Sequence, residues 1–403
     1  MNVLTLSWRY LWSRPLSTAL NLLLLTLGLA SMAFVLIAQH QVDRAFERDL
    51  QGIDAVVGAK GSPMQLILAG VFHIDVPPGN IPLEEVKILQ SHPDVAQLIP
   101  LSLGDNLQGF RIVGTTPDYA AHYGATLAQG TFWTAPMQAV LGAQVARQTG
   151  LVLGQSFVGA HGLGSGGAVH GESLYAVTGV LAPCGCVLDR LVLTATESVW
   201  KVHDDMHATE DMDEEDRAAI EADREVTLAL IRYRSPLAAA TFPRFINGST
   251  SMQAAAPAVE ITRLLSMVGV GTRVLQGLGA VLLAVAGLSV FIALWGAVRE
   301  RRHDLAMLRM LGAPPARVGT LVLCESLWLA LMACALGLLL AHGLTALAGR
   351  MLMEQQSLAI AGWQWLPAEG WVPLLAFGVA VVAALVPAIS AYRVDVTQLL
   401  NTR

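Results

Sequence analysis

Two histidines in this sequence have the spacing of paired metal ligands. His203 and His207 are four residues apart, so on a helix they share one face, which is the geometry of zinc ligands. A run of acidic residues follows them, and Asp211 is the carboxylate that we expect to complete such a site. The alternative interpretation is a solvated acidic segment over residues 208–222, because dense charge runs usually stay in water.

Cys184 and Cys186 flank a single glycine and allow three kinds of chemistry. In an oxidising compartment they pair as a disulfide, although a bridge across one residue is strained because disulfide geometry is restrictive. Metal binding or thiol exchange is the second interpretation, and two free thiols the third. Cys324 and Cys334 lie in an apolar run, where we expect small buried hydrophobic residues.

Residues 53–62 resemble a phosphate-binding loop only superficially. That loop requires lysine directly after its last glycine, and serine or threonine directly after the lysine. Here Ala59 precedes Lys60, and Gly61 follows it. We therefore predict a turn. The sequence contains no Walker motif and no Ser-His-Asp or glycosidase-like arrangement, so we expect no cofactor in this chain.

The elements that must position these side chains belong to a membrane protein. Of the 403 residues, 54% are hydrophobic and 14% are charged, whereas about a quarter are charged in an ordinary soluble domain. Four charge-poor runs are each long enough to cross a hydrocarbon core of ~30 Å. The first continues to Ala38, which favours a retained anchor over a cleaved signal peptide. The net charge of −6 gives no reason to expect nucleic acid as a partner.

The distribution of charge predicts the orientation. The segments 1–14, 299–317 and 392–403 hold nine basic and three acidic residues, whereas residues 43–273 hold 15 basic and 25 acidic. Because basic segments stay in the cytoplasm, we predict cytoplasmic N- and C-termini. The predicted organisation is an interfacial helix 1–14, spans 15–40, 273–298, 318–345 and 370–391, a periplasmic domain 41–272, a coupling helix 299–317, a periplasmic loop 346–369 and a tail 392–403.

The outer segment is predicted to be an α+β domain, because short apolar runs alternate there with turn signals. The predicted strands are 53–57, 95–99, 110–113, 139–141, 174–180, 188–193 and 227–232, and the predicted helices are 83–91, 119–123 and 142–149. The flanks 39–52 and 259–270 have helical apolar spacing and predict stalks continuous with membrane helices. These stalks either transmit movement or tether the domain passively.

A short basic amphipathic helix is predicted between the second and third spans. Leu305, Leu308 and Leu311 recur at helical spacing and form an apolar stripe. Gly312 suits the left-handed position after the last turn, and the prolines that follow cannot continue the helix. The charged residues fall largely on the other side: Arg301, Arg302, Asp304 and Arg309. Glu325, early in the third span, is expected to reach the headgroups or pair with Arg317.

This helix resembles the coupling segment of the MacB/FtsX/LolC-type (type VII) ABC transporter permeases. The matching residues are Arg301, Arg302, Asp304, Leu305, Ala306, Leu308, Arg309, Leu311, Gly312, Ala313 and Val318. The tail from Pro387 is similar to the family's closing motif but has Val396 where proline is usual. Residues 7–15 are similar to the family's N-terminal foot.

The resemblance implies a multi-pass permease subunit in a bacterial inner membrane. Such permeases pair as dimers and bind two ATPase subunits, which hold ATP and Mg²⁺ and drive the outer domain through the coupling helix, a mechanism called mechanotransmission. Family members extrude peptides, toxins or antibiotics, extract lipoproteins, or activate cell-wall hydrolases, and a periplasmic adaptor or substrate-binding protein can be a partner. The alternative is a membrane-anchored periplasmic sensor or scaffold, with or without a bound metal and without transport.

Overall fold

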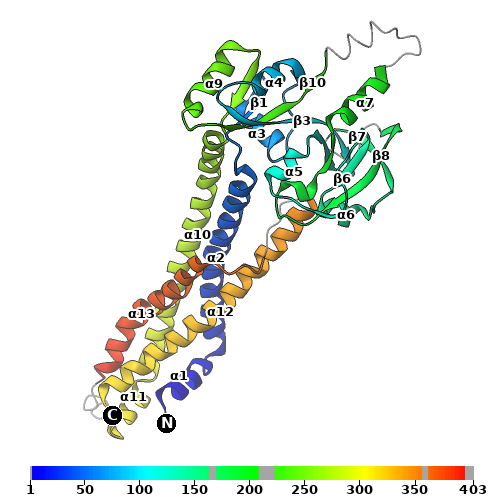
Figure 1. Ribbon diagram of the computed structural model, residues 1–403. Coiled ribbons are helices and arrows are strands. Elements are labelled where there is room, and N and C mark those ends of the chain that lie inside the picture. The colour runs from blue at the N-terminus through cyan, green and yellow to red at the C-terminus, as the bar shows by residue number, and fades with distance from the viewer. Residues whose placement is uncertain (1, 163–168, 208–222, 356–361, 395–403) are drawn as a thin grey trace, which may run out of the picture. The chain divides into compact units, whose positions relative to one another are not determined.

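The computed structural model describes residues 2–162, 169–207, 223–355 and 362–394 (Figure 1). The chain divides into two compact units, Met1–Asp43 with Met267–Arg403, and Arg44–Ser266. Both boundaries fall inside long helices, α2 (Pro15–Leu50) and α10 (Pro257–Glu300). Each stalk is therefore the continuation of a membrane helix, as its apolar spacing predicts.

The membrane unit consists of helices. Besides its parts of α2 and α10, the described residues form α1 (Val3–Trp12), α11 (Arg302–Met310), α12 (Pro315–Gln355), η2 (Pro367–Gly370) and α13 (Trp371–Tyr392). Four of these helices, α2, α10, α12 and α13, are long and apolar enough to cross a membrane. The prediction of four membrane helices is confirmed, and the bounds of the spans stay a prediction. The predicted loop 346–369 is wrong in its first ten residues, because α12 continues to Gln355 through residues with good helix propensity.

Small residues set how closely the membrane helices pack. A Cβ added at Gly337 of α12 would lie 3.1 Å from the Leu29 Cβ of α2, and one at Gly28 would lie 3.3 Å from the backbone nitrogen of Leu283 of α10. Ala376 and Ala380 of α13 are likewise buried in the common apolar cluster. Backbones approach closely at such positions, where van der Waals packing holds membrane helices together.

The second unit is an α+β domain built on one mixed sheet. In the described residues its strand order is β12-β1-β11-β3-β4-β9-β6-β8-β5, and β7 pairs with β3 and β8. The strands of this sheet are β1 (Ala55–Ala59), β3 (Val95–Leu107), β4 (Phe110–Thr115), β5 (Leu127–Gly130), β6 (Gln138–Leu141), β7 (Ser156–His161), β8 (Val169–Leu181), β9 (Val192–Ala195), β11 (Leu228–Tyr233) and β12 (Met252–Ala255). A separate two-stranded ladder joins β2 (Ile81–Pro82) and β10 (Glu225–Val226).

The helices of this domain are short. They are α3 (Pro63–Gly70), α4 (Leu83–Gln90), α5 (Asp118–His122), α6 (Ala143–Thr149), η1 (Val187–Arg190), α7 (Thr196–His207) and α9 (Ala238–Ser249). The predicted helices 83–91, 119–123 and 142–149 are confirmed as α4, α5 and α6. The turn predicted near Lys60 leads into α3, where the Ser62 hydroxyl accepts a hydrogen bond from the Gln65 N–H at the start of the helix.

Most predicted strands match, but the one over residues 188–193 is wrong in its first half. That segment begins as the 3₁₀ turn η1, and only Val192–Ala195 forms β9. Asp189 turns back to accept hydrogen bonds from the Cys184 and Gly185 N–H groups, at 3.0 and 2.7 Å. Arg190 is buried and donates to the Phe72 carbonyl, at 2.8 Å. The local contacts of Asp189 and the tertiary contact of Arg190 override the strand pattern of the apolar run.

Candidate functional site

The predicted coupling segment forms a helix that ends as its sequence indicates. α11 runs from Arg302 to Met310, and Gly312 follows with φ +94°. The Gly312 N–H donates to the Arg309 carbonyl at 3.0 Å, and the Ala313 N–H donates to the Leu308 carbonyl at 3.1 Å. Pro315 then starts α12. The left-handed glycine therefore satisfies the last carbonyls of α11 and fixes the angle at which the chain leaves it.

The apolar residues of α11 divide between two faces. Leu305 is 2% exposed and Ala306 is also buried, and together with the half-buried Leu308 they pack inside the membrane unit. Leu311 is 85% exposed, and Met307 and Met310 are more than half exposed. The stripe of Leu305, Leu308 and Leu311 is therefore divided between packed and exposed residues, a choice that the sequence leaves open. The inner leucines anchor the helix, and the outer face is formed by Met307, Met310 and Leu311.

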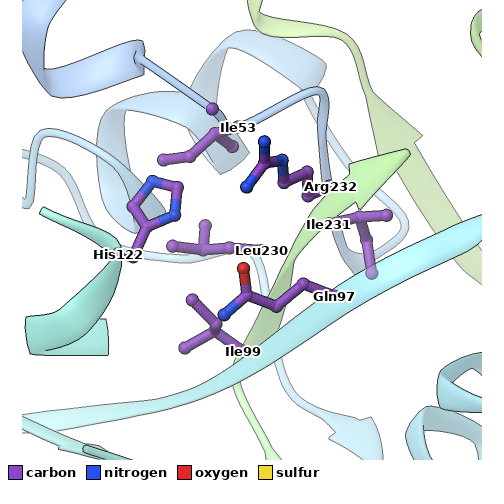
Figure 2. Close-up of a pocket in the computed structure, with 8 residues that line it drawn as sticks. Ile53, Gln97, Ile99, His122, Leu230, Ile231 and Arg232 are labelled. Carbon is purple, nitrogen blue, oxygen red and sulfur yellow. The ribbon is translucent and has the colours of Figure 1, made fainter. Parts of the chain in front are cut away.

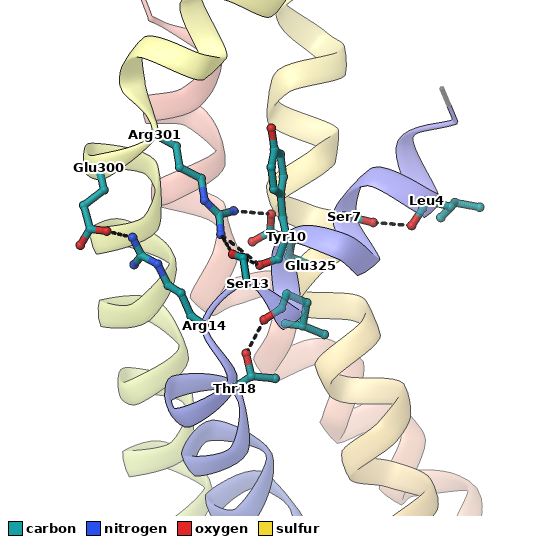
Figure 3. Close-up of polar contacts among 10 residues, drawn as sticks. Leu4, Ser7, Tyr10, Ser13, Arg14, Thr18, Glu300, Arg301 and Glu325 are labelled. Atoms are coloured by element: carbon teal, nitrogen blue, oxygen red, sulfur yellow. Dashed lines mark hydrogen bonds and ion pairs between the residues drawn. The ribbon is translucent and has the colours of Figure 1, made fainter.

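Arg301 lies at the centre of a polar network that joins three helices (Figure 3). Its guanidinium forms an ion pair with Glu325 of α12, with Nη1 and Oε1 3.3 Å apart. It donates to the Tyr10 carbonyl at 3.0 Å and to the Ser13 hydroxyl, both at the end of α1. Its Cζ atom also lies 4.4 Å from the centroid of the Tyr10 ring, which is a cation–π distance. Arg301 thus fastens the N-terminal foot to the start of α11.

Other charged residues of the segment have different surroundings. Arg309 is half-buried and donates to the Val394 carbonyl after α13, whereas Arg302 and Asp304 are exposed. Arg14 pairs with Glu300 on the last turn of α10. The expected partner of Glu325 is wrong: Glu325 is 5% exposed and pairs with Arg301, because α11 brings that guanidinium over the start of α12. In the part of the molecule described, Arg302 is the exposed cation of α11.

The ends of the two stalks are built into the core of the periplasmic domain. Phe46 and Leu50 of α2 and Leu264 and Leu265 of α10 pack against one buried cluster. The rings of Phe46 and Phe72 meet edge to face, with centroids 4.7 Å apart. A stalk end that contributes side chains to a close-packed core cannot shift without moving that core.

Polar contacts add to this hold on α2. The Asp49 carboxylate is buried and accepts a hydrogen bond from the Val187 N–H, at 3.1 Å, while its backbone carbonyl accepts one from the Tyr123 hydroxyl, at 2.8 Å. Tyr119 lies beside Tyr123, and its hydroxyl is 2.9 Å from the His73 Nε2. Burial lowers the pKa of His73 well below 6.5, and Arg111 and Arg190 lower it further. Sequence patterns did not reveal this cluster, because its members come from separate segments.

Cys184 and Cys186 are joined by a disulfide next to this cluster. Gly185 has φ +64°, as a tight hairpin requires, and Asp189 caps its N–H groups. Cys186 is buried in the same apolar cluster as the stalk ends, whereas Cys184 is half-buried. The sequence left open a disulfide, metal binding or thiol exchange, and two free thiols. In the structure the two cysteines form the disulfide.

A small pocket lies where α2 gives way to β1 (Figure 2). Ile53, Ile99 and Leu230 form its apolar lining, and Gln97, His122 and Arg232 its polar one. Its empty space, counted together with adjoining open solvent, is about 160 Å³, so its enclosed part is far smaller than a site for a drug-sized ligand. Burial lowers the pKa of His122, against a hydrogen bond with the Gln51 backbone that raises it. The pocket suits water or a small ion better than an organic substrate.

The predicted metal ligands lie largely beyond what the structure describes. His203 and His207 fall on the last turns of α7, and Asp211 lies outside the described residues. Within the described residues, no group of three or more histidine, cysteine, aspartate or glutamate side chains is placed to hold a metal ion. Zinc binding at His203 and His207 therefore stays a prediction.

Two family models together match most of the chain. The MacB-like periplasmic core domain matches residues 18–256, and the FtsX-like permease C-terminal model matches residues 277–396. A curated relative, the ABC transporter permease YtrF of Bacillus subtilis, is 25% identical over 133 residues, which are 30% of this chain and 30% of YtrF. The match therefore spans less than a third of that relative's length.

Two solved structures match about half of the chain each, both at low identity. The periplasmic region of MacB from Actinobacillus actinomycetemcomitans matches with a TM-score of 0.35 and 11% identity, covering 54% of this chain and 95% of that one. The extracellular domain of the noncanonic ABC-type transporter YknZ from Gram-positive bacteria matches with a TM-score of 0.30 and 12% identity, covering 50% and 98%.

The family assignment rests on the family models. The periplasmic model alone covers more than half of the chain, and the permease model contains α11, the helix that follows the second span. The four membrane helices and the α+β domain between the first two agree with this order. The chain belongs to the MacB/FtsX-type family of ABC transporter permeases.

Proposed function

We propose that this chain is the permease subunit of a transporter driven by an ATPase on a separate polypeptide, which binds ATP and Mg²⁺. In this proposal α11 and both termini face the cytoplasm, and two copies of the chain pair with two ATPase subunits. Closure of the ATPase pair displaces α11, and α2 and α10 carry the motion to the periplasmic domain. The domain then extrudes a substrate or extracts it from the inner membrane.

The observation that carries this proposal is the two-sided character of α11. Met307, Met310 and Leu311 form an exposed apolar face, whereas Leu305 and Ala306 hold the opposite face inside the membrane unit. Arg302 is exposed on the same short helix and adds a positive charge. An apolar face with a polar rim is typical of the core of a protein–protein contact, and methionine adapts well to a partner's surface.

The contacts behind α11 support transmission of force over passive tethering. Arg301 links α11 to α1 and α12 through partly buried polar contacts. A push on the exposed face is therefore passed to several helices together. At the other end, the last turn of α2 is held by Phe46, Leu50 and Asp49 in the domain core. Both ends of the proposed route are thus fixed within their own units.

Co-purification from native membranes tests the proposal. We expect the tagged full-length chain to retain an ATPase that carries Walker motifs, identified by mass spectrometry, and to stimulate its ATP hydrolysis. Leu311→Asp should weaken this association about tenfold or more, because a carboxylate buried in an apolar contact costs about 2 kcal/mol.

Leu237→Asp is the matched control, since Leu237 is also highly exposed but lies in the periplasmic domain. It should leave the ATPase bound. If Leu311→Asp and Leu237→Asp retain the same amount of ATPase, with the same rate of ATP hydrolysis, then the outer face of α11 is not the contact. Absence of any ATPase would favour the sensor or scaffold.

A further inference from the structure

The disulfide-bonded turn over residues 184–187, referred to as the disulfide hairpin, contacts the end of stalk α2. The hairpin is held from within by Asp189, which accepts the N–H groups of Cys184 and Gly185. The Val187 N–H, directly after the second cysteine, donates to the Asp49 carboxylate of α2, at 3.1 Å. The hairpin therefore supplies one of the polar contacts that fix the last turn of the stalk.

A second stalk residue also contacts the hairpin. A Cβ built at Gly185 would lie 3.4 Å from the Nη1 of Arg48, so the guanidinium lies over the glycine between the two cysteines. Asp49 is buried beside this hairpin. A buried carboxylate loses stability when its hydrogen-bond donor moves away. Any change in the hairpin's backbone thus acts on α2.

The disulfide contributes little to the overall stability of this domain. A cross-link stabilises a fold chiefly by closing a loop in the unfolded chain, and the gain in stability is smaller the shorter the loop. This one closes across a single residue, in a domain that already has an extensive apolar core. Its main effect is therefore local, namely the backbone path from Cys184 to Val187.

The hairpin is also accessible to solvent, and its contacts favour thiol–disulfide exchange. Gly185 is exposed and Cys184 is half-buried, whereas Cys186 is buried. The Cys186 N–H donates to the Cys184 Sγ, at 3.1 Å, and Arg48 lies nearby. The hydrogen-bond donor stabilises the Cys184 sulfur as a thiolate and makes Cys184 a better leaving group when it is released from a mixed disulfide, and a nearby cation favours thiolates in general.

We propose that Cys184 and Cys186 form a redox site, exchanged with a dithiol reductant outside the membrane, whose oxidised form clamps the end of α2 to the periplasmic domain. The exchange and the clamp stand on these contacts alone. Their consequence for transport rests on the proposed function, because it requires α2 to carry motion.

One dithiol molecule supplies the electrons and protons that reduction of this disulfide requires. A reductant thiolate attacks the Cys184 Sγ, the S–S bond breaks, and Cys186 leaves as a thiolate that takes up a proton. The second thiol of the reductant, as thiolate, then attacks the mixed disulfide and releases Cys184, which is also protonated. The protein disulfide gains two electrons and two protons, and the dithiol becomes a disulfide.

The test uses the full-length chain in detergent with dithiothreitol as the dithiol. Cys324 and Cys334 are replaced by alanine to remove background thiols. Alkylation and mass spectrometry should show that Cys184 and Cys186 become free without unfolding of the domain. On reduction, amide hydrogen exchange in residues 44–50 should accelerate about tenfold or more, while α4, which is remote in sequence, stays unchanged.

A double variant, Cys184→Ser with Cys186→Ser, separates the clamp from a general effect of reductant. It should show fast exchange in residues 44–50 from the start and no response to dithiothreitol. A disulfide that resists dithiothreitol until the domain unfolds would overturn the proposal. So would complete reduction with unchanged exchange in residues 44–50. If both effects occur but ATP hydrolysis with the co-purified ATPase is unaltered, the clamp is supported and the force route of the proposed function fails.

Discussion

Arg301 shows how a residue with the sequence signature of a partner contact can serve the chain's own structure. Four of its interactions are internal: the ion pair with Glu325, hydrogen bonds to Tyr10 and Ser13, and the cation–π contact with the Tyr10 ring. The side chain of Arg301 is 13% exposed and that of Glu325 is 6% exposed. Removing one member of such a buried pair leaves the other charge uncompensated.

Arg301→Met should therefore destabilise the protein by about 3 kcal/mol, because Glu325 loses its counter-charge. We expect a lower midpoint of thermal unfolding for the detergent-purified chain. Arg302→Met is the control on the exposed side and should change stability by less than about 0.5 kcal/mol. Adding Glu325→Gln to Arg301→Met should restore part of the loss. Equal midpoints for the two single variants would show that the ion pair contributes nothing.

The leucines of α11 illustrate the limit of sequence reasoning at this scale. Periodicity correctly predicts that the segment is an amphipathic helix, but Leu305 and Leu311 have opposite exposure. Their spacing alone cannot tell an apolar face that packs inward from one left for a partner. The difference depends on α12 and the other helices packed behind α11, which lie elsewhere in the sequence.

His73 gives a prediction about pH. Burial holds its imidazole neutral in the folded state, with Arg111 and Arg190 adding to the effect, so its pKa is well below 6.5. The unfolded chain binds a proton near pH 6.5 and the folded chain does not. Stability therefore decreases as pH falls below about 6.5, by up to ~1.4 kcal/mol per pH unit.

His73→Asn removes the titrating group while keeping a residue that tolerates the φ of +55° found here. Thermal unfolding between pH 7 and 5 should show a shallower loss of stability for this variant than for the unaltered chain. Other titrating groups are common to both proteins and cancel in the comparison. Parallel pH profiles would mean that His73 takes up its proton in the folded state.

At the scale of the elements, contacts at ends and turns decide where each helix and strand begins and ends. Most strands of the sheet follow from alternation, but η1 does not, because Asp189 and Arg190 respond to partners outside the segment. The helices α3 and α9 are not among those predicted from the sequence. In contrast, Gly312 marks the end of α11 unambiguously, because its left-handed backbone requires glycine.

Gly312→Ala should therefore loosen the end of α11 at a cost of about 1 kcal/mol. We expect faster amide hydrogen exchange over α11 and weaker stimulation of the partner ATPase, with the other membrane helices intact. Gly296→Ala in α10 is the matched control, because a Cβ there meets nothing within 4 Å and the backbone is helical. Indistinguishable exchange in the two variants would show that the glycine turn does not position α11.

At the scale of the whole molecule, the order of its parts could be predicted from hydropathy and charge. Four spans and the outer α+β domain follow from apolar runs of the right length, because a hydrocarbon core accepts few alternatives. The strand order could not be predicted, since β12 and β1 pair across almost the whole domain sequence. The exposed face of α11 and the packing of the stalk ends depend on the same kind of long-range contact.

The orientation of these parts in the membrane is the remaining prediction from charge. Single cysteines at two exposed positions test it, Ile88→Cys in α4 and Leu311→Cys after α11, in a chain with Cys324 and Cys334 replaced by alanine. A membrane-impermeant maleimide should label Ile88→Cys in intact cells with a permeabilised outer membrane, but Leu311→Cys only after lysis of the inner membrane. Arg302→Cys, on the same short helix, should behave like Leu311→Cys. Because nine basic residues gather in the three segments predicted to be cytoplasmic, labelling of Leu311→Cys before lysis would reverse the topology and remove α11 from the reach of any ATPase.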